Sequence, residues 1–226
     1  MEDKKALVIF SGGQDSTTCL AWAKQRYKEV AAISFIYGQV HEIEIVQATL
    51  IAETLGVPLD VWDISFYQEM VTSALTGNLP DMNAQHRDNN LLPASFVPNR
   101  NALFILLAHS FAQQIKAQVL VTGICQTDYS GYPDCRDEFA KAFIAALNSG
   151  ADQHIELKTP LMYKTKAETF QMAEEAGILD LVVRESHSCY NGDPNLNKWG
   201  RGCGHCPACK IRERGFAEFL ALKQGK

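Results

Sequence analysis

The stretch that decides the fold is Ala6-Leu-Val-Ile-Phe10, followed at once by Ser11-Gly-Gly-Gln-Asp-Ser16. Five apolar residues in a row are typical of a buried strand in a parallel sheet. The two glycines allow a tight turn, and the residues after them open a predicted helix that reaches about residue 26. A strand, a glycine-rich turn and a helix in direct succession predict an α/β fold with a ligand-binding turn at the carboxyl end of the first strand.

The composition of this turn predicts an anion site. The N-terminus of a helix offers unpaired N–H groups and the positive end of the helix dipole, and Ser11 and Ser16 add hydroxyl donors. The turn is not a Walker A loop, because it lacks the Gly-Lys-Ser/Thr ending, and it is not a dinucleotide fingerprint, because the third glycine is missing. The simpler alternative is a tight turn in which Asp15 or Ser16 only caps the helix.

The rest of the chain alternates short apolar strands with amphipathic helices. Apolar runs predict further strands at 30–37, 57–64, 119–123 and 155–157. Periodicity, capping residues and stop signals predict helices at 41–55, 101–115, 137–148, 165–176 and 207–222, with a capping box at Thr165-Lys-Ala-Glu168 and a stop at Gly150 for the third of these. Residues 65–94 carry Gly, Pro and several Asn without periodicity, which predicts a long irregular excursion. This order predicts a parallel five-stranded sheet with helices on both faces.

Charge and hydropathy exclude several classes of protein. The chain has 226 residues, 21 Lys and Arg against 26 Asp and Glu, and a net charge of −5. That balance argues against a general electrostatic grip on nucleic acid. The longest apolar run, 102–108, is far shorter than a membrane span, and the five apolar residues at 6–10 are too few for a signal-peptide core. We expect a soluble, cytoplasmic protein that binds no membrane.

Seven cysteines are present, and four of them crowd the last fifth of the chain. Cys203, Cys206 and Cys209 have Cys-x2-Cys-x2-Cys spacing, and Cys189 lies 14 residues upstream. Four thiolates suit a closed, structural Zn²⁺ site. An iron–sulfur cluster is one alternative, but no fourth cysteine followed by Pro comes after Cys209. A site in which His205 replaces one of the four cysteines is another. We expect an α/β domain over 1–185 and a zinc-binding segment with a final helix over 186–226.

Three further positions, Cys125, Cys135 and Arg100, are candidates for chemistry, and a fourth, Cys19, is not. Cys125 and Cys135 flank a polar stretch just beyond the fourth predicted strand, so they are either reactive groups of a substrate pocket or plain buried thiols. Arg100 stands at the start of a predicted helix, where a cation opposes the helix dipole; its role is either to bind an anion or to be a solvated side chain. Cys19 falls inside the first predicted helix and is expected in the core.

The hexapeptide Ser11–Ser16 resembles the PP-loop of the ATP pyrophosphatase superfamily. Segments along nearly the whole chain resemble the 7-cyano-7-deazaguanine synthase family. The matching segments are Phe10–Ser16, Tyr37-Gly-Gln39 with His41, Phe96-Val-Pro98 with Arg100-Asn101, Thr127-Asp128, Ser130-Gly-Tyr-Pro-Asp-Cys-Arg136, Thr159-Pro-Leu-Met162, Lys166-Ala-Glu168, Cys189-Tyr-Asn-Gly192 and Gly202–Cys209. The chain departs at Ile36, Val40 and Asn99, where the family often has a polar residue, Arg and Gly.

This resemblance implies an adenine nucleotide alpha hydrolase-like fold and a ligase that forms C–N bonds. The implied reaction takes 7-carboxy-7-deazaguanine and ammonia to the 7-nitrile through an adenylated carboxylate and an adenylated amide, for queuosine biosynthesis. The implied cofactors are one structural Zn²⁺ and ATP with Mg²⁺ as co-substrate. The implied partners are these small molecules and a second copy of the chain in a homodimer, with no nucleic acid.

The resemblance also implies roles for individual residues. The nucleotide site would comprise Phe10, Ser11, Gly12, Gly13, Gln14, Asp15, Ser16, Thr17, Thr18, Cys19 and Leu20. Arg100, Asp15 and Lys164, with Lys166 as a further candidate, would act in catalysis. Asp128, Tyr132, Asp134 and Arg136 would bind the substrate.

Two other functions stay open at this point. One is a PP-loop tRNA-modifying thiolase or lysidine-type ligase with Cys125 or Cys135 as sulfur carrier, against which the acidic balance speaks. The other is a zinc-stabilised nucleotide-binding module without chemistry.

Overall fold

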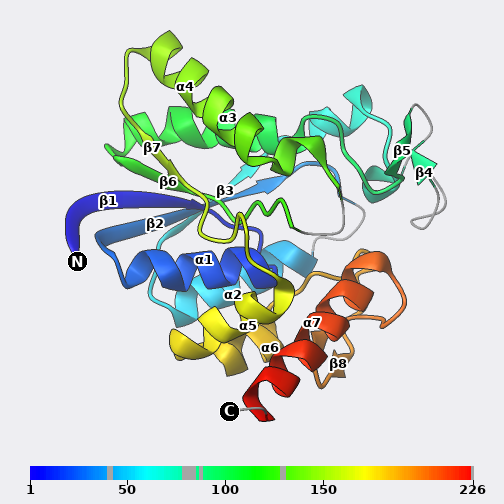
Figure 1. Cartoon of the computed structure of the whole chain (residues 1–226). Helices are drawn as coiled ribbons and strands as arrows, with labels where there is room; N and C mark the ends of the chain where they lie inside the picture. The colour runs from blue at the N-terminus through cyan, green and yellow to red at the C-terminus, as the bar shows by residue number, and fades with distance from the viewer. Residues whose placement is uncertain (40–42, 78–84, 87–88, 128–130, 225–226) are drawn as a thin grey trace.

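A parallel five-stranded sheet forms the centre of the computed structural model, which describes residues 1–39, 43–77, 85–86, 89–127 and 131–224 (Figure 1). All neighbouring strands of this sheet pair in parallel, in the order β3-β2-β1-β6-β7. The strands are β1 (Glu2–Ile9), β2 (Tyr27–Ile36), β3 (Leu59–Asp63), β6 (Val119–Val121) and β7 (Glu156–Lys158). The predicted fold class is confirmed.

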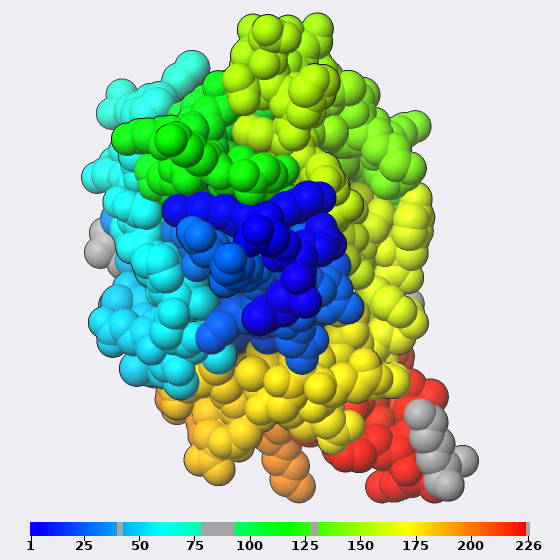
Figure 2. All heavy atoms as spheres, turned by 90° about the vertical axis from the view of Figure 1, so that its left-hand side faces the viewer, coloured from blue at the N-terminus to red at the C-terminus, as the bar shows by residue number. Residues whose placement is uncertain are grey.

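Helices cover both faces of the sheet, as the sequence predicts. The helices are α1 (Gln14–Lys24), α2 (Ile43–Thr54), α3 (Arg100–Gln114), α4 (Asp137–Ala151), α5 (Lys166–Glu175), α6 (Leu179–Glu185) and α7 (Pro207–Gln224). Side chains alternate across β1: Ala6 and Val8 pack with Leu20 of α1, while Leu7 packs with Ile105 of α3. In Figure 2 the blue N-terminal part of the chain lies between a green layer above it and a yellow layer below it.

The position of β1 in the sheet creates the binding crevice. From β1 the chain goes to β2 and β3 on one side, while β6 and β7 lie on the other side. Such a switch point opens a crevice at the carboxyl ends of the strands, where open α/β sheets bind their ligands. The turn at residues 11–13 between β1 and α1 lies at this crevice.

Several boundaries differ from the sequence prediction. The excursion at 65–94 contains the short 3-10 helices η1 (Ser65–Met70) and η2 (Ala74–Thr76) and a hairpin of β4 (Gln85–His86) with β5 (Asn89–Pro93). The predicted stop at Gly150 is wrong, because α4 continues to Ala151 and ends at Asp152, which has the left-handed φ of 51°. The sequence prediction missed α6, whose seven residues are too few to show a helical period.

The chain ends in a small unit that packs under the sheet domain. A two-stranded hairpin, β8 (Leu196–Asn197) with β9 (Gly200–Arg201), precedes α7. α7 packs on α5 through Phe170, Phe216 and Phe219, whose rings lie 5.1–6.0 Å apart. Among the described residues, no helix is long and apolar enough to cross a membrane.

Candidate active site

Hydrogen bonds of Ser11 and Ser16 fix the conformation of the turn between β1 and α1. Ser11 N donates to Ser16 Oγ at 3.2 Å, and Gly13 N donates to Ser11 Oγ at 3.4 Å. The two hydroxyl oxygens lie 3.2 Å apart, and Ser16 Oγ also donates to Gly13 O. The loop therefore presents hydroxyls and the N-terminus of α1 on one concave surface, which is the arrangement expected for a phosphate site.

Gly12 is required at the second position of the turn. Its φ is +76°, and a Cβ there would lie 2.8 Å from the backbone of Ala48 and Glu44 in α2. Real Cβ atoms do not approach backbone atoms so closely, so any side chain at this position would push α2 away from the loop. The glycine thus allows α2 to pack directly on the turn.

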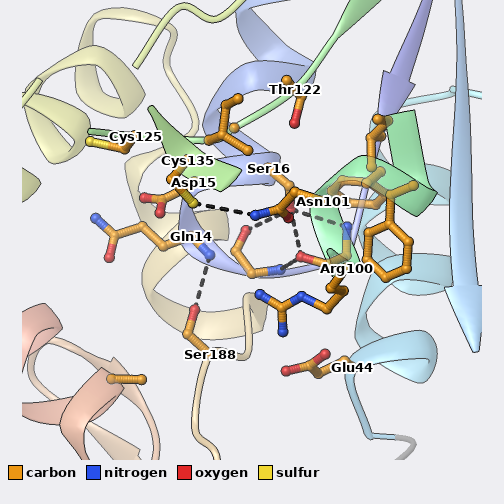
Figure 3. Close-up of a pocket in the computed structure, with 18 of the residues that line it drawn as sticks. Gln14, Asp15, Ser16, Glu44, Arg100, Asn101, Thr122, Cys125, Cys135 and Ser188 are labelled. Carbon is orange, nitrogen blue, oxygen red and sulfur yellow. Dashed lines mark hydrogen bonds between the residues drawn. The ribbon is translucent and has the colours of Figure 1, made fainter. Parts of the chain in front are cut away.

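Two residues of the C-terminal segment, residues 186–226, also hold the turn. His187 N donates to Gly12 O at 3.0 Å. Ser188 Oγ accepts a hydrogen bond from Gln14 N, the first N–H of α1, at 3.2 Å (Figure 3). The sequence analysis missed both residues; their only signal is that they directly precede Cys189.

A cavity of about 270 Å³ opens beside the turn. It is lined by six of the predicted nucleotide-site residues: Phe10, Ser11, Gly13, Gln14, Asp15 and Ser16. The other five are placed beside the cavity without lining it: Gly12 against α2, and Thr17, Thr18, Cys19 and Leu20 buried in α1. Six of the seven residues of the stretch Phe10–Ser16 therefore line the cavity.

Arg100, the first residue of α3, also lines the cavity. Its Nη1 donates to the Tyr37 hydroxyl at 3.4 Å, and its guanidinium lies 5.6 Å from the centre of the Tyr37 ring. Burial acts to lower the pKa of Arg100, but the surrounding tyrosines and Asp134 outweigh burial and raise that pKa. The guanidinium is therefore a permanent cation in the cavity, available to an anionic ligand.

The backbone before Arg100 explains a departure from the family pattern. Asn99 precedes α3 with a φ of +56°, a left-handed conformation that Gly adopts freely and that Asn tolerates better than most residues. The Asp134 carboxylate accepts a hydrogen bond from Asn101 N at 3.0 Å and so places a negative charge at the N-terminus of α3. This charge offsets the unfavourable position of the Arg100 cation at the positive end of the helix dipole.

Glu44 is a cavity residue that the sequence analysis missed. It stands in the first turn of α2, and Figure 3 shows its carboxylate near the Arg100 guanidinium. Burial raises the pKa of Glu44 to about 7; Arg100 acts to lower it and Cys189 to raise it. A carboxyl group whose pKa lies near neutral pH therefore lines the cavity close to Arg100.

The predicted substrate residues lie in different environments in the structure. Tyr132 lines the cavity, and its hydroxyl lies 2.8 Å from Ser95 Oγ. Asp134 is buried against α3 and does not line the cavity, and Arg136 is exposed, with its Nη1 3.8 Å from Glu138. Asp128 lies outside the described residues.

A second, smaller cavity of about 180 Å³ adjoins the first, and both are lined by Asp15, Cys125 and Lys166. Lys166 Nζ donates to Asp15 Oδ2 at 2.5 Å, so this ion pair stands where the two cavities meet. Lys164 lines only the second cavity and pairs with Glu168 at 3.2 Å. Of the two lysines, Lys166 is the one next to the phosphate turn.

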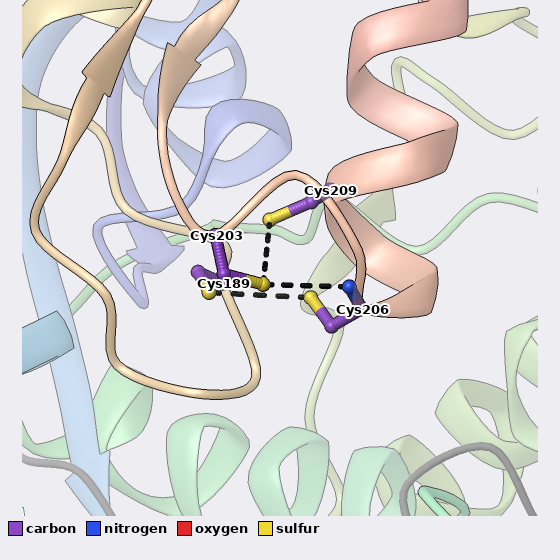
Figure 4. Close-up of side chains that lie close together, drawn as sticks. All are labelled: Cys189, Cys203, Cys206 and Cys209. Carbon is purple, nitrogen blue, oxygen red and sulfur yellow. Dashed lines mark hydrogen bonds between the residues drawn. The ribbon is translucent and has the colours of Figure 1, made fainter.

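The four C-terminal cysteines come together as a candidate metal centre (Figure 4). Their sulfur atoms all lie within 4.8 Å of one another, with Cys203–Cys209 at 3.9 Å and Cys189–Cys206 at 4.0 Å. Sulfurs bound 2.3 Å from one zinc ion would lie about 3.8 Å apart in a tetrahedron. The four thiols therefore fit one tetrahedral ion, and all are free of disulfides.

The backbone around the cluster supports this geometry. Cys206 N and Asn191 Nδ2 both donate to Cys203 Sγ at 3.4 Å, which are bonds that stabilise a thiolate. A Cβ on Gly202 would lie 2.5 Å from Cys209 Sγ, so only glycine fits there. His205 is bound instead to Cys203 O, at 2.9 Å, and is not one of the four ligands.

The remaining cysteines lie in or near the cavity. Cys125 and Cys135 both line it; Cys125 Sγ lies 3.1 Å from Thr127 Oγ1, and Cys135 Sγ accepts from Asn101 Nδ2 at 3.3 Å. Cys19 is fully buried, as predicted, and burial raises the pKa of its thiol. Whether Cys125 or Cys135 is reactive stays a prediction.

The sequence is similar to curated proteins over nearly its whole length. It is 50% identical over 223 residues to the 7-cyano-7-deazaguanine synthase of Wolinella succinogenes, covering 98% of this chain and 96% of the relative. It is 47% identical to the protein of that name from Helicobacter pylori strain P12, with 98% of each chain covered, and 48% identical to that from Bacteroides fragilis, with 99% of each covered.

A solved structure shares the fold of this chain, and a family model matches most of its sequence. A 4-thiouridine synthetase in complex with RNA and bound ATP superposes with a TM-score of 0.51 at 16% identity, covering 98% of this chain and 53% of that one, which shows a shared fold. The family model described as queuosine biosynthesis protein QueC matches residues 5–220. This match and the near-full-length identity to the synthases show that the chain belongs to the QueC family of queuosine biosynthesis proteins.

Proposed function

We propose that this protein is an ATP-dependent ligase that converts 7-carboxy-7-deazaguanine and ammonia into 7-cyano-7-deazaguanine, for queuosine biosynthesis. The observation that carries the proposal is that the PP-loop turn, Arg100 and Tyr132 line one cavity in a chain that is 50% identical to a 7-cyano-7-deazaguanine synthase. The tRNA-modifying alternative is not favoured, because the near-full-length relatives carry the synthase name.

The chemistry requires two rounds of activation. A carboxylate is a poor electrophile, because oxide and hydroxide are poor leaving groups. Transfer of AMP from ATP to the carboxylate releases pyrophosphate and makes AMP the leaving group, and ammonia then displaces AMP to give the amide. A second transfer of AMP, to the amide oxygen, lets AMP leave with the loss of the remaining N–H protons and gives the nitrile. Because no protein nucleophile is needed, the site must mainly position the reactants and neutralise charge.

The geometry supports specific roles in binding and activating the triphosphate. The PP-loop residues Ser11, Gly13 and Ser16 would hold the β- and γ-phosphates at the N-terminus of α1. Arg100 would neutralise charge on the transferring α-phosphate, and Lys166 would do so beside Asp15. Mg²⁺ bound to the triphosphate would supply further charge neutralisation.

At the substrate end, we propose that Tyr132 contacts the deazaguanine, supported by its place in the cavity wall. Asp134 would act indirectly, by holding the start of α3 and hence Arg100. Direct roles for Lys164, Asp128 and Arg136 stay predictions from the family resemblance.

We further propose that the metal is one structural Zn²⁺, held by Cys189, Cys203, Cys206 and Cys209, and that residues 186–226 form a zinc-binding unit on the nucleotide-binding domain of residues 1–185. Four thiol donors with tetrahedral spacing support this choice. A homodimer in the cytoplasm, without nucleic acid, completes the proposal; the net charge of −5 supports the absence of a nucleic-acid partner.

Mass spectrometry of the reaction product tests the proposed function. The purified protein is incubated with 7-carboxy-7-deazaguanine, Mg-ATP and ammonium, and the product is separated by liquid chromatography. We expect the mass of 7-cyano-7-deazaguanine, formed only when all three substrates are present. AMP release without any nitrile or amide would contradict the proposal. Elemental analysis of the same preparation, with one zinc and no iron per chain expected, tests the metal.

A further inference from the structure

The serine that precedes the first metal ligand lies on the phosphate side of the PP-loop. Ser188 Oγ accepts the Gln14 N–H at 3.2 Å, and a Cβ on Gly13 would lie 3.2 Å from Ser188 Oγ and 3.4 Å from Ser11 Oγ. Ser188 is half-buried and lines the cavity. The hydroxyls of Ser11 and Ser188 therefore flank Gly13, the residue that precedes α1.

The hydrogen bonds of Ser188 leave a donor available to a ligand. A hydroxyl can accept and donate at once. Within the described part of the chain, the Ser188 hydroxyl accepts the Gln14 N–H and makes no other hydrogen bond. An anion at the N-terminus of α1 would thus meet the Ser188 O–H as a donor after a rotation of that hydroxyl hydrogen alone, while the Gln14 N–H stays bound to Ser188 Oγ.

The backbone at Ser188 is fixed from both sides. On one side, His187 N donates to Gly12 O at 3.0 Å. On the other side, Cys189 is part of the four-thiol cluster. Buried Arg212, three residues after Cys209, donates to Ser186 O at 3.1 Å and to Ser186 Oγ at 3.0 Å. The segment that carries Ser188 is therefore tied to the PP-loop and to the metal site at once.

We propose that Ser188 is a phosphate-binding residue that the C-terminal segment supplies to the PP-loop, and that the four-cysteine metal site holds it in position. The phosphate is taken to be that of ATP, so the inference rests on the proposed function. Binding of the metal and binding of the nucleotide are then coupled. A metal that positions Ser188 raises the affinity for the triphosphate, and the triphosphate raises the affinity for the metal by the same factor.

Binding of Mg²⁺ with α,β-methylene-ATP, which cannot be cleaved between the α- and β-phosphates, tests the role of Ser188. Calorimetric titrations are made on the zinc-loaded protein. Ser188→Ala is expected to weaken binding of this analogue roughly 10- to 100-fold, the effect of one hydrogen bond to a charged group. AMP lacks the β- and γ-phosphates, so its affinity is expected to stay within about twofold, as is usual when no direct contact is lost.

Two sets of variants serve as controls. Ser110→Ala removes an exposed hydroxyl of α3 that donates to Leu106 O and lines neither cavity, and it is expected to leave the affinity for the analogue unchanged. Ser188→Thr and Ser188→Val have nearly the same shape, so the pair isolates the hydroxyl even if Ser188→Ala disturbs the fold. Thr is expected to bind the analogue as the wild type does, and Val as weakly as Ala.

The phosphate role would be overturned if Ser188→Val bound the analogue as tightly as the wild type does. It would also be overturned if Ser188→Ala lost as much affinity for AMP as it loses for the analogue. Removing the metal with a chelator tests the second half. Affinity for the analogue should fall in the wild type but little further in Ser188→Ala, whereas an equal fall in both would contradict the link. A wild-type protein that bound no analogue would instead refute the proposed function itself.

Discussion

The two ends of the cavity are built in different ways. The proposed phosphate end is built mainly from one stretch, Phe10–Ser16, of which all residues but Gly12 line the cavity, and Ser188 is the residue that joins it from elsewhere in the chain. The other end is assembled from single side chains that are far apart in sequence, among them Tyr37, Arg100 and Tyr132. A surface made by backbone tolerates few substitutions because its shape is the fold itself, while a surface made by side chains can change one contact at a time.

The strongest test of this difference is Gly12→Ala at the phosphate end. The added Cβ would meet the α2 backbone at 2.8 Å and would hold a φ of +76°. We expect a loss of about 3 kcal/mol or more in the free energy of unfolding and no measurable ATP binding. Chemical denaturation and calorimetry measure the two effects. Gly150→Ala, in α4 where a Cβ meets nothing within 4 Å, is the matched control and should keep both properties. A Gly12→Ala protein with wild-type stability would show that the turn is not tied to α2.

Arg100→Ala tests the side-chain end with the next largest effect. Arg100 lines the cavity, and its Nη1 donates to the Tyr37 hydroxyl. Loss of a cation that stabilises transition-state charge is expected to lower kcat roughly 100-fold or more. Its melting temperature should change little, because α3 keeps the Asp134 contact to Asn101 N. Steady-state kinetics measure the loss, and Arg100→Lys should recover part of it. Wild-type turnover of Arg100→Ala would remove this residue from the mechanism.

Glu44→Gln tests how burial affects the titration of a carboxyl group that lines the cavity. Burial raises the pKa of this carboxyl to about 7, from a usual value near 4.5. The folded state therefore binds the proton more tightly than the unfolded state, and stability falls as pH rises from about 4.5 to 7. Removing the charge should make Glu44→Gln more stable than wild type at pH 8, by on the order of 2 kcal/mol, with no difference at pH 4.5. Denaturation curves at the two pH values measure this, and an equal difference at both would contradict the titration of Glu44.

The smallest effect is expected from Arg136→Ala. Its guanidinium lies outside the cavity, 3.8 Å from the exposed Glu138 carboxylate, and such surface pairs contribute at most about 1 kcal/mol. We expect KM for 7-carboxy-7-deazaguanine to change less than about twofold, whereas Tyr132→Ala, in the cavity wall, should raise it roughly tenfold through lost ring contact. Substrate saturation curves decide between them. A large rise in KM for Arg136→Ala would mean that the substrate reaches beyond the cavity described here.

These contrasts explain what the sequence could predict. The sheet, the helices and the PP-loop follow from short-range patterns, and the capping box at Thr165–Glu168 forms as expected because its two hydrogen bonds lie within four residues. The four cysteines were predicted because metal-ligand spacing is a strong pattern. Glu44 and Ser188 were missed because their roles depend on α2 and the C-terminal segment folding back onto the loop. No local pattern encodes such a contact between distant segments.

The substrate end was predicted only in part for the same reason. The stretch from Tyr132 to Arg136 looks uniform in sequence, but the 3-10 turn η3 (Pro133–Cys135) sends its side chains in different directions. Tyr132 reaches the cavity, Asp134 reaches α3, and Arg136 reaches solvent.

In the proposed reaction, one cavity activates the substrate twice with ATP. The ratio of AMP released to nitrile formed, measured by quantitative chromatography on one reaction mixture, tests this most directly. We predict that two AMP molecules appear for each nitrile formed. Reactions without ammonia should yield no nitrile. One AMP per nitrile, or ADP in place of AMP, would contradict the account.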